Sequence, residues 1–172
     1  MRWVLTCLVL FTLAVGGASA ASPQAQPWRT LTNDRVGYSL SYPPRWKIAG
    51  KVVATQFAAA ARCQSVRFVD RAGPSEVRQS IVQVCWKPVT RDTSLDSYMR
   101  KTYARRLSSF FVKTTLGGVP AYRSRTGTKN RTFFLQTNDY RLQVVAGVAA
   151  GPLRRAARVA QVNRILRSFA VT

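Results

Sequence analysis

The stretch that decides the fold runs from Phe111 to Val148 and reads FVKTTLGGVPAYRSRTGTKNRTFFLQTNDYRLQVVAGV. It contains four runs rich in β-branched and aromatic residues, and short turn segments containing Gly, Asn or Asp separate them. The predicted strands are Phe111–Leu116, Pro120–Thr126, Arg131–Thr137 and Tyr140–Val148. Between the last two, Asn138-Asp139 is typical of a two-residue hairpin turn. This stretch therefore predicts a sheet of sequential strands joined by tight turns.

A second group of strands is predicted upstream. Residues 36–42 (VGYSLSY) alternate with a period of two, and Pro43-Pro44 must end that strand because proline cannot continue a hydrogen-bonded ladder. Trp46 follows the turn, and its large ring is expected to be buried. The further extended segments predicted here are Trp46–Phe57, Gln64–Asp70 and Gln79–Trp86.

Each group of strands is followed by one predicted helix. The first runs from Asp92 to Phe110, with Thr93 and Asp96 spaced as in a capping box. Its expected apolar face carries Leu95, Met99, Thr102, Arg106 and Phe110, with Tyr98 and Tyr103 beside it. The second runs from Gly151 to about Arg167, and its stripe is Val159, Val162, Leu166 and Phe169. This order favours the α+β class, with an antiparallel sheet and helices on its faces.

The N-terminus has the layout of a secretory signal peptide. Arg2 precedes an apolar run, and Ala18-Ser19-Ala20 forms a small-residue cleavage site. An uncleaved anchor is the alternative, although the apolar run is short for a membrane span. Cys7 precedes most of the apolar run, so lipidation is not expected. The predicted organisation is a signal peptide at 1–20, a flexible leader at 21–35 and one domain at 36–172.

Two cysteines, Cys63 and Cys85, remain after the predicted cleavage. Export implies an oxidising compartment, which favours a disulfide between them, and both lie in predicted strands that could be neighbours. Two isolated buried thiols are the alternative. No metal site is expected, because two cysteines without histidine are a poor ligand set.

Charge is the strongest functional signal. The chain has no histidine and carries 27 Lys and Arg residues against 6 Asp and Glu, a formal charge of +21. Histidine-based relays are thus excluded, and polyanions become the expected partners. Asp92 and Asp96 are better explained as acids at a helix start than as a catalytic pair. No catalytic motif and no cofactor-binding fingerprint is present, so no catalytic residue, no cofactor and no enzymatic activity is expected.

Arginine is the commoner cation, at 21 residues against 6 lysines. A guanidinium binds phosphate and sulfate with two parallel hydrogen bonds, so the bias suits anionic ligands. A GC-rich genome would produce the same bias without a function. The segment 123–131 is the best candidate patch, while Phe133 and Phe134 behind it are expected in the core. The candidate binding residues are Arg123, Arg125, Lys129, Arg131, Arg100, Lys101, Arg105, Arg154 and Arg158.

Several segments resemble the PsbP-like family. They are Gly37–Trp46, Ser94–Tyr98, Leu116–Arg123 and Ile165–Phe169, which follow one another in the family's order and spacing. The resemblance implies an α/β/α sandwich around a mostly antiparallel sheet. The family's members include extrinsic subunits of photosystem II, a nuclear-transport factor and exported bacterial proteins, so it implies docking rather than catalysis. The family does not predict the high charge, and no catalytic residue carries over.

These observations predict an exported, non-catalytic binding module with a basic surface. The expected partner is an acidic protein, an envelope polymer, lipid head groups or nucleic acid. One alternative is a structural subunit of an envelope or membrane-associated complex. Another is a hydrolase of phosphate or sulfate esters that uses Ser or Lys with arginine clamps.

Overall fold

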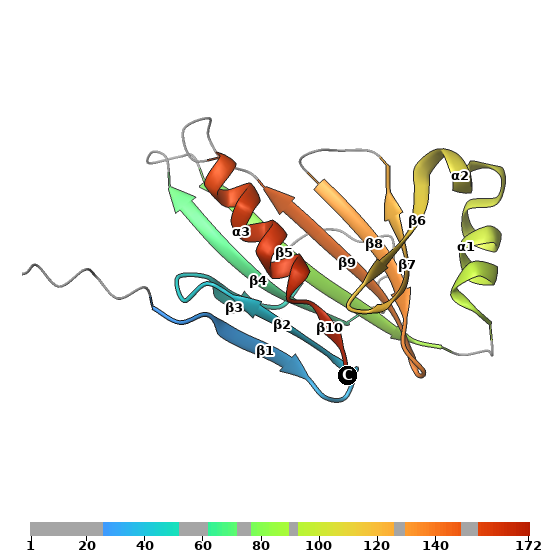
Figure 1. Ribbon diagram of the computed structural model, residues 1–172, viewed down its shortest axis with the longest axis horizontal. Helices are drawn as coiled ribbons and strands as arrows, with labels where there is room; N and C mark the ends of the chain where they lie inside the picture. The colour runs from blue at the N-terminus through green and yellow to red at the C-terminus, as the bar shows by residue number, and fades with distance from the viewer. Residues whose placement is uncertain (1–25, 52–61, 72–76, 90–92, 126–129, 149–154) are drawn as a thin grey trace, which may run out of the picture.

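A seven-stranded antiparallel sheet forms the centre of the computed structural model, which describes residues 26–51, 62–71, 77–89, 93–125, 130–148 and 155–172 (Figure 1). The strand order is β3-β4-β5-β9-β8-β7-β6, and every neighbouring pair is antiparallel. The strands are β3 (Lys47–Ala49), β4 (Arg62–Arg71), β5 (Val77–Pro88), β6 (Phe111–Leu116), β7 (Val119–Ser124), β8 (Asn130–Gln136) and β9 (Tyr140–Val148). The strands predicted between 111 and 148 are confirmed to within one or two residues.

A second, three-stranded sheet consists of β1 (Arg29–Asn33), β2 (Tyr38–Tyr42) and β10 (Ala170–Val171), in the order β1-β2-β10. The prediction of a flexible leader at 21–35 is wrong over β1, which pairs along its whole length with β2. The reason lies in the sequence of β1. The Leu31 side chain is buried in the core, and its two neighbours in the sequence are threonines, which favour extended backbone. Residues 1–25, which include the predicted signal peptide, lie outside the described residues.

The turns that the sequence singled out have the expected form. Strand β2 ends at Tyr42, before Pro43-Pro44, and Trp46 is buried just beyond. Gly117 and Gly118 join β6 to β7 with φ angles of 64° and 81°, a left-handed conformation that favours glycine. Of the extended segment predicted over Trp46–Phe57, the structure describes residues 46–51. Only β3 forms within its described part, and residues 52–57 lie outside it.

The helix predicted from Asp92 to Phe110 is interrupted. It consists of α1 (Leu95–Tyr103), a 3₁₀ turn η1 (Ala104–Arg106) and the single turn α2 (Leu107–Phe110). Ala104 has a φ of 43°, and this break shifts the phase of the side chains that follow. Leu107 packs on the core, whereas Arg106 and Phe110, which were expected on the apolar face, are exposed. Thr102, which was also expected on this face, is exposed as well, so the predicted face holds at Leu95 and Met99 and is wrong at Thr102, Arg106 and Phe110.

The N-cap of α1 also differs from the prediction. Ser94, not Thr93, caps the helix, because its hydroxyl oxygen accepts a hydrogen bond from the Ser97 N–H at 3.2 Å. The Asp96 side chain does not bond back to the N-cap residue and instead accepts hydrogen bonds from Lys113 on β6 and Tyr122 on β7. Asp92 lies outside the described residues.

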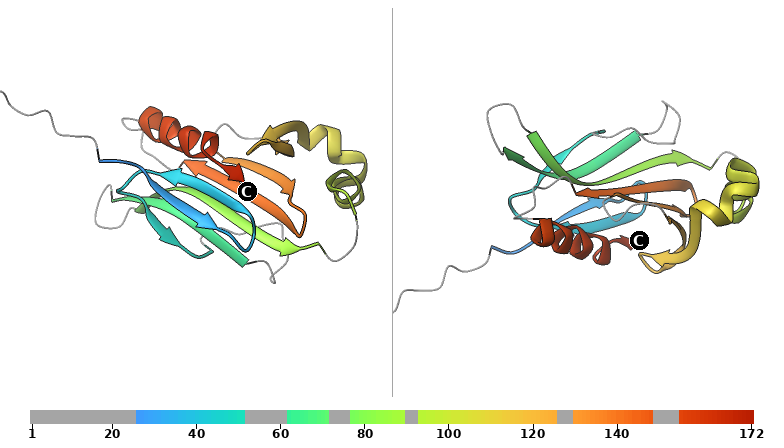
Figure 2. Two further views of the ribbon diagram at one scale, coloured as in Figure 1. Left: turned by 60° about the horizontal axis from the view of Figure 1, so that its bottom comes forward. Right: turned by 90° about the horizontal axis from the view of Figure 1, so that it is seen from above.

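Helices cover both faces of the large sheet. The longer helix, α3 (Arg155–Arg167), packs against β5, β9 and the small sheet, and α1 contacts β8. Successive strand residues join different cores: Ala121 belongs to the core beneath α3, and Tyr122 to the core beneath α1. Figure 2 shows α3 lying across the large sheet well away from α1 and α2. This arrangement is of the predicted α+β class.

The predicted disulfide is present. Cys63 on β4 and Cys85 on β5 lie directly opposite each other in the ladder, with 4.1 Å between their Cα atoms. The bond therefore links two strands that hydrogen bonds already join, on the face of the sheet that α1 covers.

Candidate anion-binding site

Four cations line one groove between the helical segment α1–η1–α2 and two strands, the edge strand β6 and its neighbour β7. The groove has a volume of about 520 Å³. We call it the basic groove and define it by its cations, which are Arg100, Arg105, Lys113 and Arg125. Phe111 and Tyr122, which also line it, are almost completely buried. Cationic side chains thus stand around a partly aromatic floor.

Each cation comes from a different element. Arg100 lies on α1, Arg105 on the 3₁₀ turn η1, and Lys113 on the edge strand β6. Arg125 follows the end of β7, where its Nε donates a hydrogen bond to the Ser108 carbonyl oxygen at 2.9 Å. Its backbone N–H donates to the Phe110 carbonyl oxygen at 2.7 Å. These two bonds fix Arg125 against α2.

A carboxylate outside the lining of the groove bonds to two of the residues that line it, Lys113 and Tyr122. Asp96 accepts a hydrogen bond from Lys113 Nζ at 2.7 Å and another from the Tyr122 hydroxyl at 2.7 Å. The bond from Lys113, followed by the one from Tyr122, holds the pKa of Asp96 below its usual value. The same contact raises the pKa of Lys113. Lys113 is therefore neutralised by an internal partner.

The three arginines of the basic groove differ from Lys113 in this respect. Within the described ranges, none of Arg100, Arg105 and Arg125 forms an ion pair. All three side chains are exposed to solvent. Their positive charge is available to an external anion, and a guanidinium can bind phosphate, sulfate or carboxylate oxygens with two parallel hydrogen bonds.

The structure separates the cations that the sequence grouped together. Arg100, Arg105 and Arg125 share the basic groove, but Lys101 is exposed on α1 and does not line it. Arg123 is exposed and, by strand alternation, lies on the face opposite Tyr122. The proposed 123–131 patch is thus not a single surface in its described part.

The other predicted cations have local partners or are not described. Arg131 donates to Asn163 Oδ1 on α3 at 2.8 Å and lines a separate cavity with Arg167. Arg158 stacks over the ring of Phe68 at 3.6 Å. Lys129 and Arg154 lie outside the described residues.

Sequence reasoning missed Lys113 and Tyr122, which line the groove, and the bonds of both to Asp96. One signal for Lys113 was available, because a lysine in the middle of a strand commonly marks an exposed sheet edge. Lys113 is two residues from Phe111, so both face the same side of β6. No sequence signal links Asp96 to Tyr122, which is 26 residues away and meets it only in the folded protein.

A buried arginine fixes the helical wall of the groove to the sheet. Arg141 on β9 is 7% exposed, and its Nη2 donates to the Thr93 carbonyl and hydroxyl oxygens at 3.0 and 2.9 Å. Its Nε donates to Gln136 Oε1, and its guanidinium stacks on the Tyr98 ring at 4.2 Å. Burial lowers the pKa of Arg141. These contacts hold the start of α1, and with it Asp96, against the hairpin β8–β9.

Comparison with protein-family models and with curated proteins finds no match for this chain. Within the described residues, no cluster of three or more Cys, Asp or Glu side chains is placed to hold a metal ion. The described helices are also too short or too polar to cross a membrane.

Proposed function

We propose that this protein is a non-catalytic binding module that docks an anionic partner in its basic groove. The observation that carries the proposal is the convergence of Arg100, Arg105 and Arg125 on one groove, where none of them forms an ion pair within the described part of the chain. A general excess of arginine would place cations over the whole surface. A general excess would not by itself bring cations from several separate elements to the same cavity.

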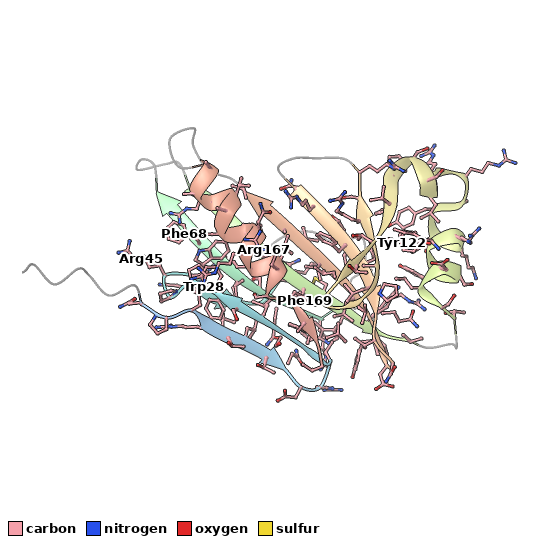
Figure 3. The ribbon with its side chains drawn as sticks, in the orientation of Figure 1. Trp28, Arg45, Phe68, Tyr122, Arg167 and Phe169 are labelled. Atoms are coloured by element: carbon pink, nitrogen blue, oxygen red, sulfur yellow. A yellow bond between two sulfur atoms is a disulfide. The ribbon has the colours of Figure 1, made fainter. Side chains whose placement is uncertain are left out.

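The location of the groove supports docking. It lies at the end of the molecule that carries α1, and its strand wall is β6, the edge of the large sheet. Figure 3 places Tyr122 beside α1 and Arg45 at the opposite end of the molecule. A large partner can approach this end without contacting the small sheet.

A PsbP-like fold is part of the same proposal. The two helical layers on opposite faces of an antiparallel sheet agree with an α/β/α sandwich, and the glycine turn and buried Trp46 have the form that the resemblance implied. The family's docking role supports a binding function over catalysis. Export by the predicted signal peptide belongs to the proposal as well, and a disulfide agrees with an oxidising compartment.

The test must distinguish binding in the basic groove from binding that depends only on the protein's net charge. We would neutralise Arg100, Arg105 and Arg125 to Gln in residues 21–172 and measure heparin affinity across a salt series. The matched control neutralises Arg29, Arg35 and Arg45, which are also exposed and lie on or beside the small sheet. Each released counterion contributes about one unit of slope in a plot of log affinity against log salt.

We expect the slope of the groove variant to fall by roughly three units. The control variant should keep nearly the native slope, although both proteins have lost the same charge. Equal losses in the two variants would show that the charge acts as a diffuse surface property, and the proposal would then fail. Thermal unfolding of both variants confirms that they are folded.

A further inference from the structure

An exposed aromatic ring lies beside the basic groove. Phe110, at the end of α2, is 41% exposed and belongs to neither hydrophobic core. The other large hydrophobic side chains that are exposed in the described part of the chain, Ile48 and Val69, lie on β3 and β4 at the opposite edge of the large sheet. Figure 1 shows α2 at an outer corner of the molecule. The ring is therefore accessible to a partner that meets this corner.

Arginines lie near Phe110 in the fold. The Phe110 carbonyl oxygen accepts a hydrogen bond from the backbone N–H of Arg125 at 2.7 Å, so the backbones of these two residues are held together. Arg106 and Phe110 together line a second cavity of about 460 Å³, which shares Phe111 with the basic groove. Arg105 lies on the 3₁₀ turn just before α2. An apolar ring thus projects from a set of arginines.

We propose that this corner docks on an anionic phospholipid bilayer, with Phe110 entering the headgroup region and Arg105, Arg106 and Arg125 binding lipid phosphates. The inference rests on the proposed function and names its partner. An aromatic ring amid cations fits the membrane interface, because the ring is buried at the depth of the acyl boundary while the cations stay at the level of the phosphates. Each cation near an anionic membrane surface strengthens binding about five-fold.

Single-stranded nucleic acid fits the corner less well. Such ligands stack successive bases on a row of exposed aromatic rings. Here the neighbouring rings are used internally: Phe111 is buried, and the Tyr103 ring packs against it with 4.6 Å between centroids. Within the described residues, Phe110 is the aromatic side chain that remains well exposed at this corner.

The test compares Phe110→Ala with Ile48→Ala, a substitution of a similarly exposed apolar side chain at the far edge of the sheet. Residues 21–172 of each variant are mixed with vesicles of phosphatidylcholine and phosphatidylglycerol in equal amounts, and bound protein is measured by co-sedimentation. We expect Phe110→Ala to bind these vesicles about five-fold more weakly, since it no longer buries a partly exposed ring. Ile48→Ala should bind as the native protein does, and neither change should alter heparin affinity.

Equal vesicle binding by the two variants, or no vesicle binding by a native protein that binds heparin through the groove, would overturn the membrane inference. The proposed function would survive both results. Binding of both variants to single-stranded DNA is measured as well. If Phe110→Ala weakened binding to single-stranded DNA but not to vesicles, Phe110 would be assigned to base stacking, and the membrane inference would be overturned. Failure of the native protein to bind either heparin or vesicles would remove both proposals.

Discussion

Arg141 illustrates how a single side chain can hold a helix to a sheet. Its guanidinium is buried, yet its partners are the neutral groups of Thr93 and Gln136 and the ring of Tyr98. A buried cation with neutral partners costs desolvation energy that its hydrogen bonds must offset. The hydrogen bonds and the ring contact by which Arg141 anchors α1 are therefore expected to offset this desolvation energy.

Arg141→Ala is expected to lower the free energy of unfolding by about 2 kcal/mol, because it leaves hydrogen-bond acceptors unsatisfied and removes the contact with Tyr98. Urea unfolding measures this change. The control, Arg45→Ala, removes an exposed arginine and should change stability by less than about 0.5 kcal/mol. Similar effects of the two substitutions would contradict the anchoring role.

Asp96 predicts a specific pH dependence. The pKa of Asp96 is lowered in the folded protein by Lys113 and Tyr122, from an ordinary value of 3.8. Below that value the unfolded chain binds a proton that the folded protein does not, so the ionised carboxylate stabilises the fold above it. The contribution disappears as the pH falls through the lower, folded pKa.

Asp96→Asn removes this titration. We expect its unfolding free energy to lie below that of the native protein at neutral pH, and the difference to shrink as the pH falls below about 3.8. Urea unfolding at a series of pH values measures it. A difference that stays constant through this acidic range would show that Asp96 is not stabilised by its two donors.

At the scale of elements, the β6–β7 hairpin depends on two adjacent glycines with different surroundings. A Cβ at Gly117 would lie 2.9 Å from Cδ1 of Phe169 and 3.1 Å from the Val171 nitrogen. A Cβ at Gly118 would meet nothing within 4 Å. Both residues have positive φ, so the pair separates backbone strain from steric overlap.

Gly118→Ala should therefore lower the unfolding free energy by about 1 kcal/mol, the cost of placing an L side chain in a left-handed conformation. Gly117→Ala should lower it by clearly more, since Phe169 and Val171 must also move. Thermal or urea unfolding of both variants tests this order. Equal losses would mean that the small sheet adjusts without cost.

The disulfide makes a separate prediction for β4 and β5. Cys63 and Cys85 are 22 residues apart in the sequence, and a crosslink of that span stabilises a fold by about 3 kcal/mol through the entropy of the unfolded chain. Reduction, or Cys63→Ser with Cys85→Ser, should cost about this amount. Intact mass after alkylation, with and without prior reduction, reports whether the bond is present. Thiols that alkylate without reduction would contradict it.

The sequence predicted the positions of the strands better than the break within the first helix. Strand periodicity, Gly117-Gly118 and Asn138-Asp139 located the strands from β6 to β9, because turn chemistry and alternation are local properties. The break at Ala104 was missed because neither proline nor glycine marks it, and alanine is a good helix former. That omission also placed Phe110 and Arg106 on the apolar face of a continuous helix, whereas both are exposed.

At the scale of the whole molecule, composition predicted an anionic partner but not where it would bind. The arginines of the basic groove come from α1, η1 and the segment after β7, which the chain brings together by folding. Grouping by sequence instead favoured 123–131, but Arg125 lies past the end of β7 and bonds to α2, whereas Arg131 bonds to Asn163 on α3. The relevant proximity was tertiary, so no linear pattern contained it.

Pairing of β2 with β10 has a kinetic consequence for the protein. The Ser41 N–H donates to Ser168 Oγ, a contact between residues 127 positions apart, and β10 extends the small sheet next to it. Such contacts require closure of a very long loop before any energy is gained, and chains dominated by them fold slowly. Tyr38 and Leu40, which are fully buried in the native state, must therefore stay solvated or transiently associated until α3 and β10 arrive. The β1–β2 hairpin is local in sequence, whereas β10 can join it in a growing chain only after residues 170–171 have been made.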